Sequence, residues 1–301
     1  VDQTILYVLY GLAASFTLIC WPGFESPFLL VKATVLRVTA AVLLLLWSVS
    51  CALSGELKWR RTPLDIPLAG LLLTGVISTA FSMNWQASLA GAIRQEGLWM
   101  MFVYAVLYYL SAWYLAKGRR WLTSLRLFAL SSLAPAVITL LQKSGVDFSG
   151  LFRRDVMTYM GTFGNRPFYG YYLALVLPLV AYLAWRERVP WRRLALAAGG
   201  LLNLYMLYVT GNRAAALGVL ASAIAALALL ALRSRSPLGV ILAGAGVLLL
   251  VIALLFGATW NTRYGARLRS AVGFGSDDNI EGRYSFWRSS LRMIGDRPLQ
   301  G

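Results

Sequence analysis

The sequence has no histidine and only two cysteines among its 301 residues. The lack of histidine excludes His-ligated metal sites, and catalytic triads with a histidine base, from this stretch of chain. Cys20 and Cys51 both lie in apolar segments and are predicted to sit near opposite faces of a membrane. We therefore expect each cysteine to pack against neighbouring helices and not to form a disulfide.

Charged residues are also scarce, at 13% of the sequence, whereas soluble domains average about 25%. Acidic residues are scarcer than basic ones, with 12 Asp and Glu against 28 Lys and Arg, which gives a net charge of +16. The basic residues lie at the ends of long apolar blocks, and no basic stripe marks a polar domain. We therefore exclude nucleic acid as a partner, and we predict neither a metal site nor another cofactor.

Apolar residues dominate instead, at 59% of the sequence, and the mean hydropathy is +0.66. They form blocks of about 20 residues, the length that a helix needs to cross a bilayer core about 30 Å thick. We predict an all-α, polytopic integral membrane protein whose transmembrane domain covers residues 1–259, followed by the start of an extracytoplasmic loop at 260–301. About nine transmembrane helices are expected, at residues 4–21, 33–53, 65–82, 98–116, 121–141, 168–185, 193–210, 213–232 and 238–259.

The basic residues also predict the topology. Four short breaks, around Lys58, Lys117, Arg186 and Arg233, hold twelve basic residues against two acidic ones. The positive-inside rule places these breaks in the cytoplasm, together with the N-terminus, and places the tail outside. Both ends of the sequence are expected to be cuts in a longer chain.

Several arginines nevertheless fall on the predicted outer side, which runs against that rule. They include Arg94, Arg154, Arg166 and Arg213. Binding of an anion on this face would explain them. The alternative is that each side chain extends to the lipid headgroups.

The segment Gly161-Thr162-Phe163-Gly164-Asn165-Arg166-Pro167-Phe168 leads into the sixth predicted helix. Asn165 or Arg166 is suited to cap that helix, and Pro167 suits its first turn. A helix start with free N–H groups and a nearby arginine can bind an anion. The alternative is a capped helix start without a ligand.

The triplet Gly-Asn-Arg recurs at the tight junction of the seventh and eighth predicted helices, as Gly211-Asn212-Arg213. Small residues follow, so this helix can pack closely against its neighbours. Arg213 has no acidic neighbour in the sequence, and burying it alone would be costly. The phosphate of a lipid substrate would supply a partner, and bidentate geometry favours arginine for that purpose.

The tail stretch from Glu281 to Gly295 has the pattern of an amphipathic helix that lies in the membrane interface. Its apolar face comprises Tyr284, Trp287, Leu291 and Ile294. Arg283 lies at the edge of this face and is placed to reach the membrane domain. Arg288 and Arg292 point away from it, toward water.

Taken together, these segments resemble the O-antigen ligase and O-antigen polymerase (Wzy-type) superfamily of bacterial membrane glycosyltransferases. The resemblance rests on four segments in order, which are Arg94-Gln95-Glu96-Gly97-Leu98, Gly161-Thr162-Phe163-Gly164-Asn165, Gly211-Asn212-Arg213-Ala214, and Gly282-Arg283 through Trp287 to Pro298-Leu299-Gln300-Gly301. The sequence departs from the family at Asn212, where serine is common, and at Pro167, where asparagine often stands.

The resemblance implies a fold similar to the large (GT-C-like) lipid-linked-sugar glycosyltransferases and a site in the outer part of the bacterial plasma membrane. Such an enzyme passes a glycan from an undecaprenyl-pyrophosphate carrier to an acceptor, which is lipid A core, polysaccharide or protein, and needs no metal. Arg213 and Arg283 match the family's two key arginines. Substrate-binding residues are expected at Arg94, Arg154, Asn165, Arg166 and Asn212, and a family histidine is expected beyond Gly301.

Two other classes of protein remain open on the residues alone. A transporter or flippase for a lipid-linked sugar or an anion would usually carry polar sites near the middle of the membrane. Here the arginines gather at one face, which favours chemistry at the surface. A structural scaffold would leave the outer arginines without an explanation.

Overall fold

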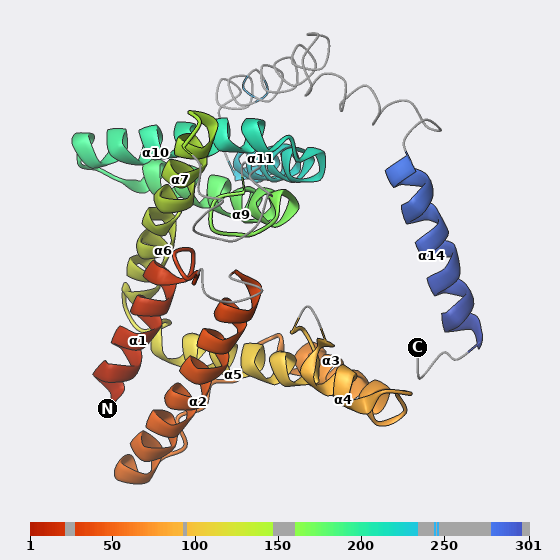
Figure 1. Cartoon of the computed structure of the whole chain (residues 1–301). Coiled ribbons are helices and arrows are strands. Elements are labelled where there is room, and N and C mark those ends of the chain that lie inside the picture. The colour runs from red at the N-terminus through yellow and green to blue at the C-terminus, as the bar shows by residue number, and fades with distance from the viewer. Residues whose placement is uncertain are drawn as a thin grey trace. The chain divides into compact units, whose positions relative to one another are not determined.

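A computed structural model of the chain describes residues 1–21, 28–92, 95–146, 160–233, 244, 246 and 278–296. All the regular elements in these ranges are helices, and no strand occurs among them (Figure 1). The helices are α1 (Asp2–Ser15), α2 (Leu29–Ser54), α3 (Asp65–Ala80), α4 (Trp85–Ala90), α5 (Leu98–Tyr114), α6 (Arg120–Ser131), α7 (Leu133–Lys143), α9 (Arg166–Arg186), α10 (Pro190–Thr210), α11 (Arg213–Arg233) and α14 (Asp278–Asp296).

Four helical segments are long and apolar enough to cross a membrane, namely Leu29–Ser54, Arg120–Lys143, Arg166–Arg186 and Pro190–Thr210. Three shorter apolar helices cover Asp65–Ala80, Leu98–Tyr114 and Ala214–Leu229. Eight of the nine predicted membrane segments therefore carry a described helix. The ninth, at 238–259, lies almost wholly outside the described residues, as does the predicted domain boundary at 259–260, so the count of nine stays a prediction.

The first predicted helix is shorter than expected, because α1 ends at Ser15 and not near residue 21. The chain turns there, and the Leu18 N–H donates to the Ser15 carbonyl over 2.8 Å. Thr17 is fully buried, and its hydroxyl donates to the carbonyl of Ser131 on α6 over 2.8 Å. A helix of 14 residues is about 21 Å long, which is less than the apolar core of a bilayer.

The fifth predicted helix is broken at Ser132 into α6 and α7. Proline causes the break, because Pro135 has no N–H and its ring clashes with the carbonyl four residues earlier, which is that of Ser131. That carbonyl accepts the Thr17 hydroxyl instead. The membrane segment predicted at 121–141 therefore corresponds to the candidate span Arg120–Lys143, and it differs from the prediction only in the interruption at Ser132.

The chain divides into two compact units, each with its own packing. Helices α1 to α6 belong to the first unit, and α7 to α11 belong to the second. In the first unit, α1 packs against α2, α5 and α6. One buried cluster in its core comprises Ile5, Leu9, Leu43, Leu110 and Tyr114. A second comprises Ala33, Leu36, Ala40, Met100 and Val103.

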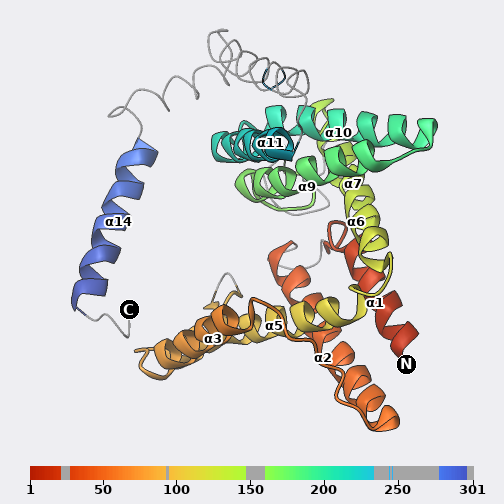
Figure 2. The same ribbon diagram turned by 180° about the vertical axis from the view of Figure 1, so that it is seen from behind.

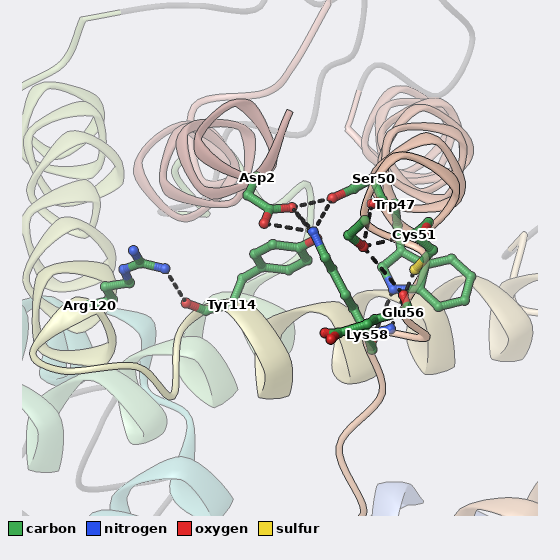
Figure 3. A network of polar contacts seen from close by, with 9 residues as sticks. Asp2, Trp47, Ser50, Cys51, Glu56, Lys58, Tyr114 and Arg120 are labelled. Carbon is green, nitrogen blue, oxygen red and sulfur yellow. Dashed lines mark hydrogen bonds and ion pairs between the residues drawn. The ribbon is translucent and has the colours of Figure 1, made fainter.

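A polar network joins α1, α2 and α5 in the first unit (Figure 3). Lys58 forms an ion pair of 2.8 Å with Asp2 and donates to the Ser50 hydroxyl over 2.5 Å. The hydroxyls of Tyr114 (3.0 Å) and Ser50 also donate to Asp2. Burial alone would raise the pKa of Asp2, but the hydrogen bonds from Lys58, Ser50 and Tyr114 prevail and lower it to about 2. Asp2 is therefore a charged anchor over the whole physiological pH range.

In the second unit, α10 lies along α9 and also contacts α7, and α9 lies along α11. Figures 1 and 2 show these helices side by side from opposite directions. Two adjacent glycines allow α10 to approach closely. A Cβ at Gly199 would lie 3.1 Å from Leu133 Cδ2 on α7, and one at Gly200 would lie 3.3 Å from Val180 Cγ1 on α9. The fully buried Asn203 of α10 also donates to the Ser132 hydroxyl over 2.8 Å.

Candidate functional site

Two helices of the second unit begin with arginine, as the sequence predicts. Asn165 is the N-cap of α9, Arg166 is its first residue, and Pro167 follows in the first turn. Arg213 is the first residue of α11. The expected helix starts are therefore confirmed. The side chain of Asn165 makes no capping hydrogen bond, so Asn165 holds the cap position through its backbone alone.

The turn before α9 is packed against α7. Gly161 (φ +53°) has a conformation that favours glycine. A Cβ on Gly161 would lie 3.0 Å from the Pro135 carbonyl oxygen and 3.1 Å from Thr139 Oγ1, and its N–H donates to Gln142 Oε1 over 3.4 Å. This motif needs its glycine for contact with α7, whether or not a ligand binds beside it.

Aromatic stacking fixes the first turns of α9. Tyr169 is fully buried, and its ring stacks on Phe163 with the centroids 5.3 Å apart. Phe163 also packs on Tyr172 at 4.8 Å. The turn and the helix that it opens are thus held as one rigid piece, because the same phenylalanine contacts both tyrosines.

At the other helix start, Gly211 ends α10 with φ +63° and its N–H donates to the Tyr208 carbonyl over 3.1 Å. Asn212 then caps α11, because its Oδ1 accepts the Ala215 N–H over 3.1 Å. This is a sharp reversal with a helix C-cap and the next N-cap on adjacent residues.

Asn212 also joins the two helix starts. Its Nδ2 donates to the carbonyl of Pro167 in the first turn of α9 over 3.0 Å. A Cβ at Gly170 would lie only 2.4 Å from that Nδ2, so only glycine leaves room for the amide. Further along, Gly218 of α11 faces Ala174 of α9. The two helices therefore run parallel with their N-termini together.

This arrangement places two positive helix ends side by side. Each helix N-terminus carries about half a positive elementary charge, and each also leaves backbone N–H groups without a partner inside the helix. Arg166 and Arg213 are the first residues of these two helices. Such a surface stabilises an anion with several oxygen acceptors, such as a phosphate or diphosphate group.

Not every predicted site residue can be placed at this end of the second unit. Asn165, Arg166, Asn212 and Arg213 are brought together there by the backbone. Arg283 lies in the second turn of α14. The structure describes the backbone of Arg213 and Arg283 and not their side chains. Arg94 and Arg154 lie outside the described residues.

The neighbours of Arg94 belong to a turn that Arg37 of α2 holds together. The Arg37 guanidinium donates to the side-chain oxygen (3.0 Å) and the backbone oxygen (3.1 Å) of Gln95, and to the Ala90 carbonyl (3.3 Å). Gln95 itself has φ +58°, a conformation that L-residues seldom adopt. Arg37 stabilises this turn, a role that the sequence did not indicate.

Gly170 is the other residue that sequence reasoning missed. A signal for it exists in the pattern of small residues four apart, with Gly170 and Ala174 on one helix and Ala214 and Gly218 on the next. This spacing is typical of helices that approach closely in membranes.

The tail helix is confirmed as α14, and its apolar side chains Tyr284, Trp287, Leu291 and Ile294 are 66%, 68%, 69% and 53% exposed.

The helical fold and its apolar spans define the class of the molecule, which is a helical membrane protein. Within that class, residues 198–301 match the model of the O-antigen ligase family (Wzy_C). The matched stretch includes Asn212, Arg213 and Arg283, and it confirms the resemblance to the O-antigen ligase superfamily that the motifs predicted. Comparison with curated proteins and comparison with solved structures each gave no significant match.

Proposed function

We propose that this protein transfers a glycan from an undecaprenyl-pyrophosphate carrier to an acceptor on the outer face of the bacterial plasma membrane. One observation carries the proposal. The helix starts that bear Arg166 and Arg213 lie together in the second unit, joined by Asn212, and two of these three residues fall within the stretch that matches the O-antigen ligase family. The acceptor is a lipid A core, a growing polysaccharide or a protein.

The charge at this site suits the proposed reaction. An acceptor hydroxyl oxygen attacks the anomeric carbon, the bond from that carbon to the pyrophosphate oxygen breaks, and the acceptor proton passes to a general base. Negative charge grows on the leaving pyrophosphate as its bond breaks. Arg213 and Arg283, together with the helix N-termini, stabilise that growing charge more than the ground state, and this difference lowers the barrier.

The proposed orientation puts both helix starts outside and the polar network of Asp2 and Lys58 in the cytoplasm. The distribution of charge supports it, since the four short breaks around Lys58, Lys117, Arg186 and Arg233 hold twelve basic residues against two acidic ones. α14 is proposed to lie in the outer interface with Trp287 toward the lipid. Its exposed apolar side chains support this location.

The test is transfer by the full-length protein in proteoliposomes that contain an undecaprenyl-pyrophosphate-linked glycan and an acceptor. Arg213→Ala and Arg283→Ala should each lower the rate by about 10² to 10³, by analogy with other groups that stabilise an oxyanion. Arg292→Ala is the matched control from the same helix as Arg283 and should transfer at the normal rate.

Two outcomes would contradict the proposal. Equal transfer by all three variants would show that the site is elsewhere. Movement of the labelled lipid across the membrane without a new glycosidic bond would show a transporter or flippase.

A further inference from the structure

The Asn212 side chain serves both helices at once. Its Oδ1 accepts the Ala215 N–H in its own helix, α11, and its Nδ2 donates to the Pro167 carbonyl of α9. These two contacts commit the carbonyl oxygen and one N–H of the amide to the chain itself. A residue committed in this way is better suited to holding other groups in place than to binding a ligand with the same atoms.

The parallel arrangement of α9 and α11 needs such a link. Parallel neighbours bring helix ends of the same sign together, and these ends repel each other until an anion neutralises them. The contact at 3.0 Å between Asn212 and Pro167 opposes that repulsion at the first turn. Gly170 is the second part of the arrangement, because any larger residue would occupy the volume of the Asn212 amide.

We propose that Asn212 and Gly170 form a positioning pair, which fixes the starts of α9 and α11 in register so that both bind one diphosphate group. This inference rests on the proposed function and concerns the same site. It makes Asn212 a positioning residue and not a catalytic one. The geometry also predicts that the two residues are coupled, because the three atoms nearest to a Cβ at position 170 all belong to the Asn212 side chain.

The coupling is tested by a cycle of variants at positions 170 and 212. Gly170→Ala places a methyl group where Asn212 Nδ2 lies and should displace the amide. Asn212→Ser keeps a good capping group for α11 but is too short to reach Pro167, so it should lose the bridge without losing the cap. In the Asn212→Ser background the methyl at position 170 no longer meets Nδ2 but still meets the Cβ of residue 212, 2.7 Å away, so adding Gly170→Ala should have a clearly smaller further effect than in the wild type.

The control is Gly218→Ala. It also replaces a helical glycine on one of these two helices, but its Cβ would lie 3.8 Å from the Ala174 Cβ, which is ordinary contact. Gly218→Ala should therefore behave as the wild type. Thermal unfolding of every variant shows whether the protein is folded, so a loss of function in an unfolded variant is recognised as such.

The readout is binding of undecaprenyl pyrophosphate, without any glycan, to the full-length protein in nanodiscs, with undecaprenyl monophosphate as the second probe. Asn212→Ser and Gly170→Ala should each weaken binding of the diphosphate roughly tenfold, the equivalent of one hydrogen bond. Monophosphate binding should change less, because a single phosphate does not need both helix starts. In the transfer assay, the KM for the donor should rise while the KM for the acceptor stays constant.

The outcomes separate this inference from the proposed function. Normal diphosphate binding by both single variants, or additive effects in the double variant, would overturn the positioning pair even if transfer is observed. If the wild type binds the diphosphate without transferring a glycan, the proposed function fails. In that case the diphosphate binding of the variants at positions 170 and 212 alone decides whether the positioning pair is correct.

Discussion

The buried contact between Asn203 of α10 and Ser132 of α7 gives a prediction about stability. Both residues are fully buried, and the Asn203 Nδ2 donates to the Ser132 hydroxyl over 2.8 Å. The Oδ1 of the same amide is buried and has no hydrogen-bond partner among the described residues. This side chain therefore contributes one hydrogen bond and already carries the cost of one unpaired group.

Ser132→Ala removes the acceptor and leaves the Asn203 amide with no partner on this side. An unpaired buried polar group costs about 1–3 kcal/mol in water-soluble proteins, whereas interhelical hydrogen bonds in bilayers average about 0.6 and reach about 1.7 kcal/mol. We expect Ser132→Ala to lower the free energy of unfolding by about 1–1.5 kcal/mol. Asn203→Leu removes the donor and the unpaired oxygen together. The double variant Ser132→Ala/Asn203→Leu should therefore be at least as stable as the wild type.

The assay is unfolding in mixed micelles with increasing sodium dodecyl sulfate, followed by circular dichroism. Ser132→Ala should unfold at the lowest detergent fraction, and Asn203→Leu should restore the midpoint when it is added. The reasoning is refuted if the double variant is as unstable as Ser132→Ala, because the unpaired amide would then not be the cause.

Three further predictions concern other parts of the chain. Arg37→Lys should lower transfer several-fold, because a lysine cannot reproduce the three hydrogen bonds that hold the turn next to position 94, and a transfer rate equal to wild type would contradict that role. The lowered pKa of Asp2 predicts that its stabilising contribution is complete above pH 3.8 and disappears as the pH falls through about 2. Because Asp2 is 49% exposed, we expect only about 1 kcal/mol of this effect, and acid titration of Lys58→Ala beside the wild type should show a smaller loss, since the hydrogen bonds from Ser50 and Tyr114 remain. The emission of a fluorophore attached to Trp287→Cys should shift to shorter wavelengths when vesicles are added, whereas that of one attached to Arg292→Cys should not, and equal responses would exclude the interfacial orientation of α14.

Local signals predicted the helix starts well. The start of α9 at Arg166 follows from the glycines, the asparagine and Pro167, all within a few residues of one another. The start of α11 follows from the same residue types around Gly211 and Asn212. Such signals act through the backbone of the residue itself or of its immediate neighbours, so a single sequence contains them in full.

Contacts between distant segments could not be predicted in the same way. The bond from Asn212 to Pro167 joins residues 45 positions apart, and that from Thr17 to Ser131 joins residues 114 apart. Hydropathy predicted that the first helix continues past Ser15, because the apolar block does so. It cannot indicate that the Thr17 hydroxyl donates to the distant carbonyl of Ser131. Pro135 was visible in the sequence, but its effect on the fifth predicted helix was missed because the apolar block continues on both sides of it.

The divided crossing formed by α6 and α7 has a consequence for biosynthesis. Asn203 enters the membrane 71 residues after Ser132, and an amide surrounded by lipid alone is unfavourable. α7, already inserted, offers this amide a hydroxyl, so α10 gains by joining the earlier helix directly instead of diffusing away from the translocon. Ser132, which lies at the break between α6 and α7, thus determines which earlier helix α10 packs against during insertion.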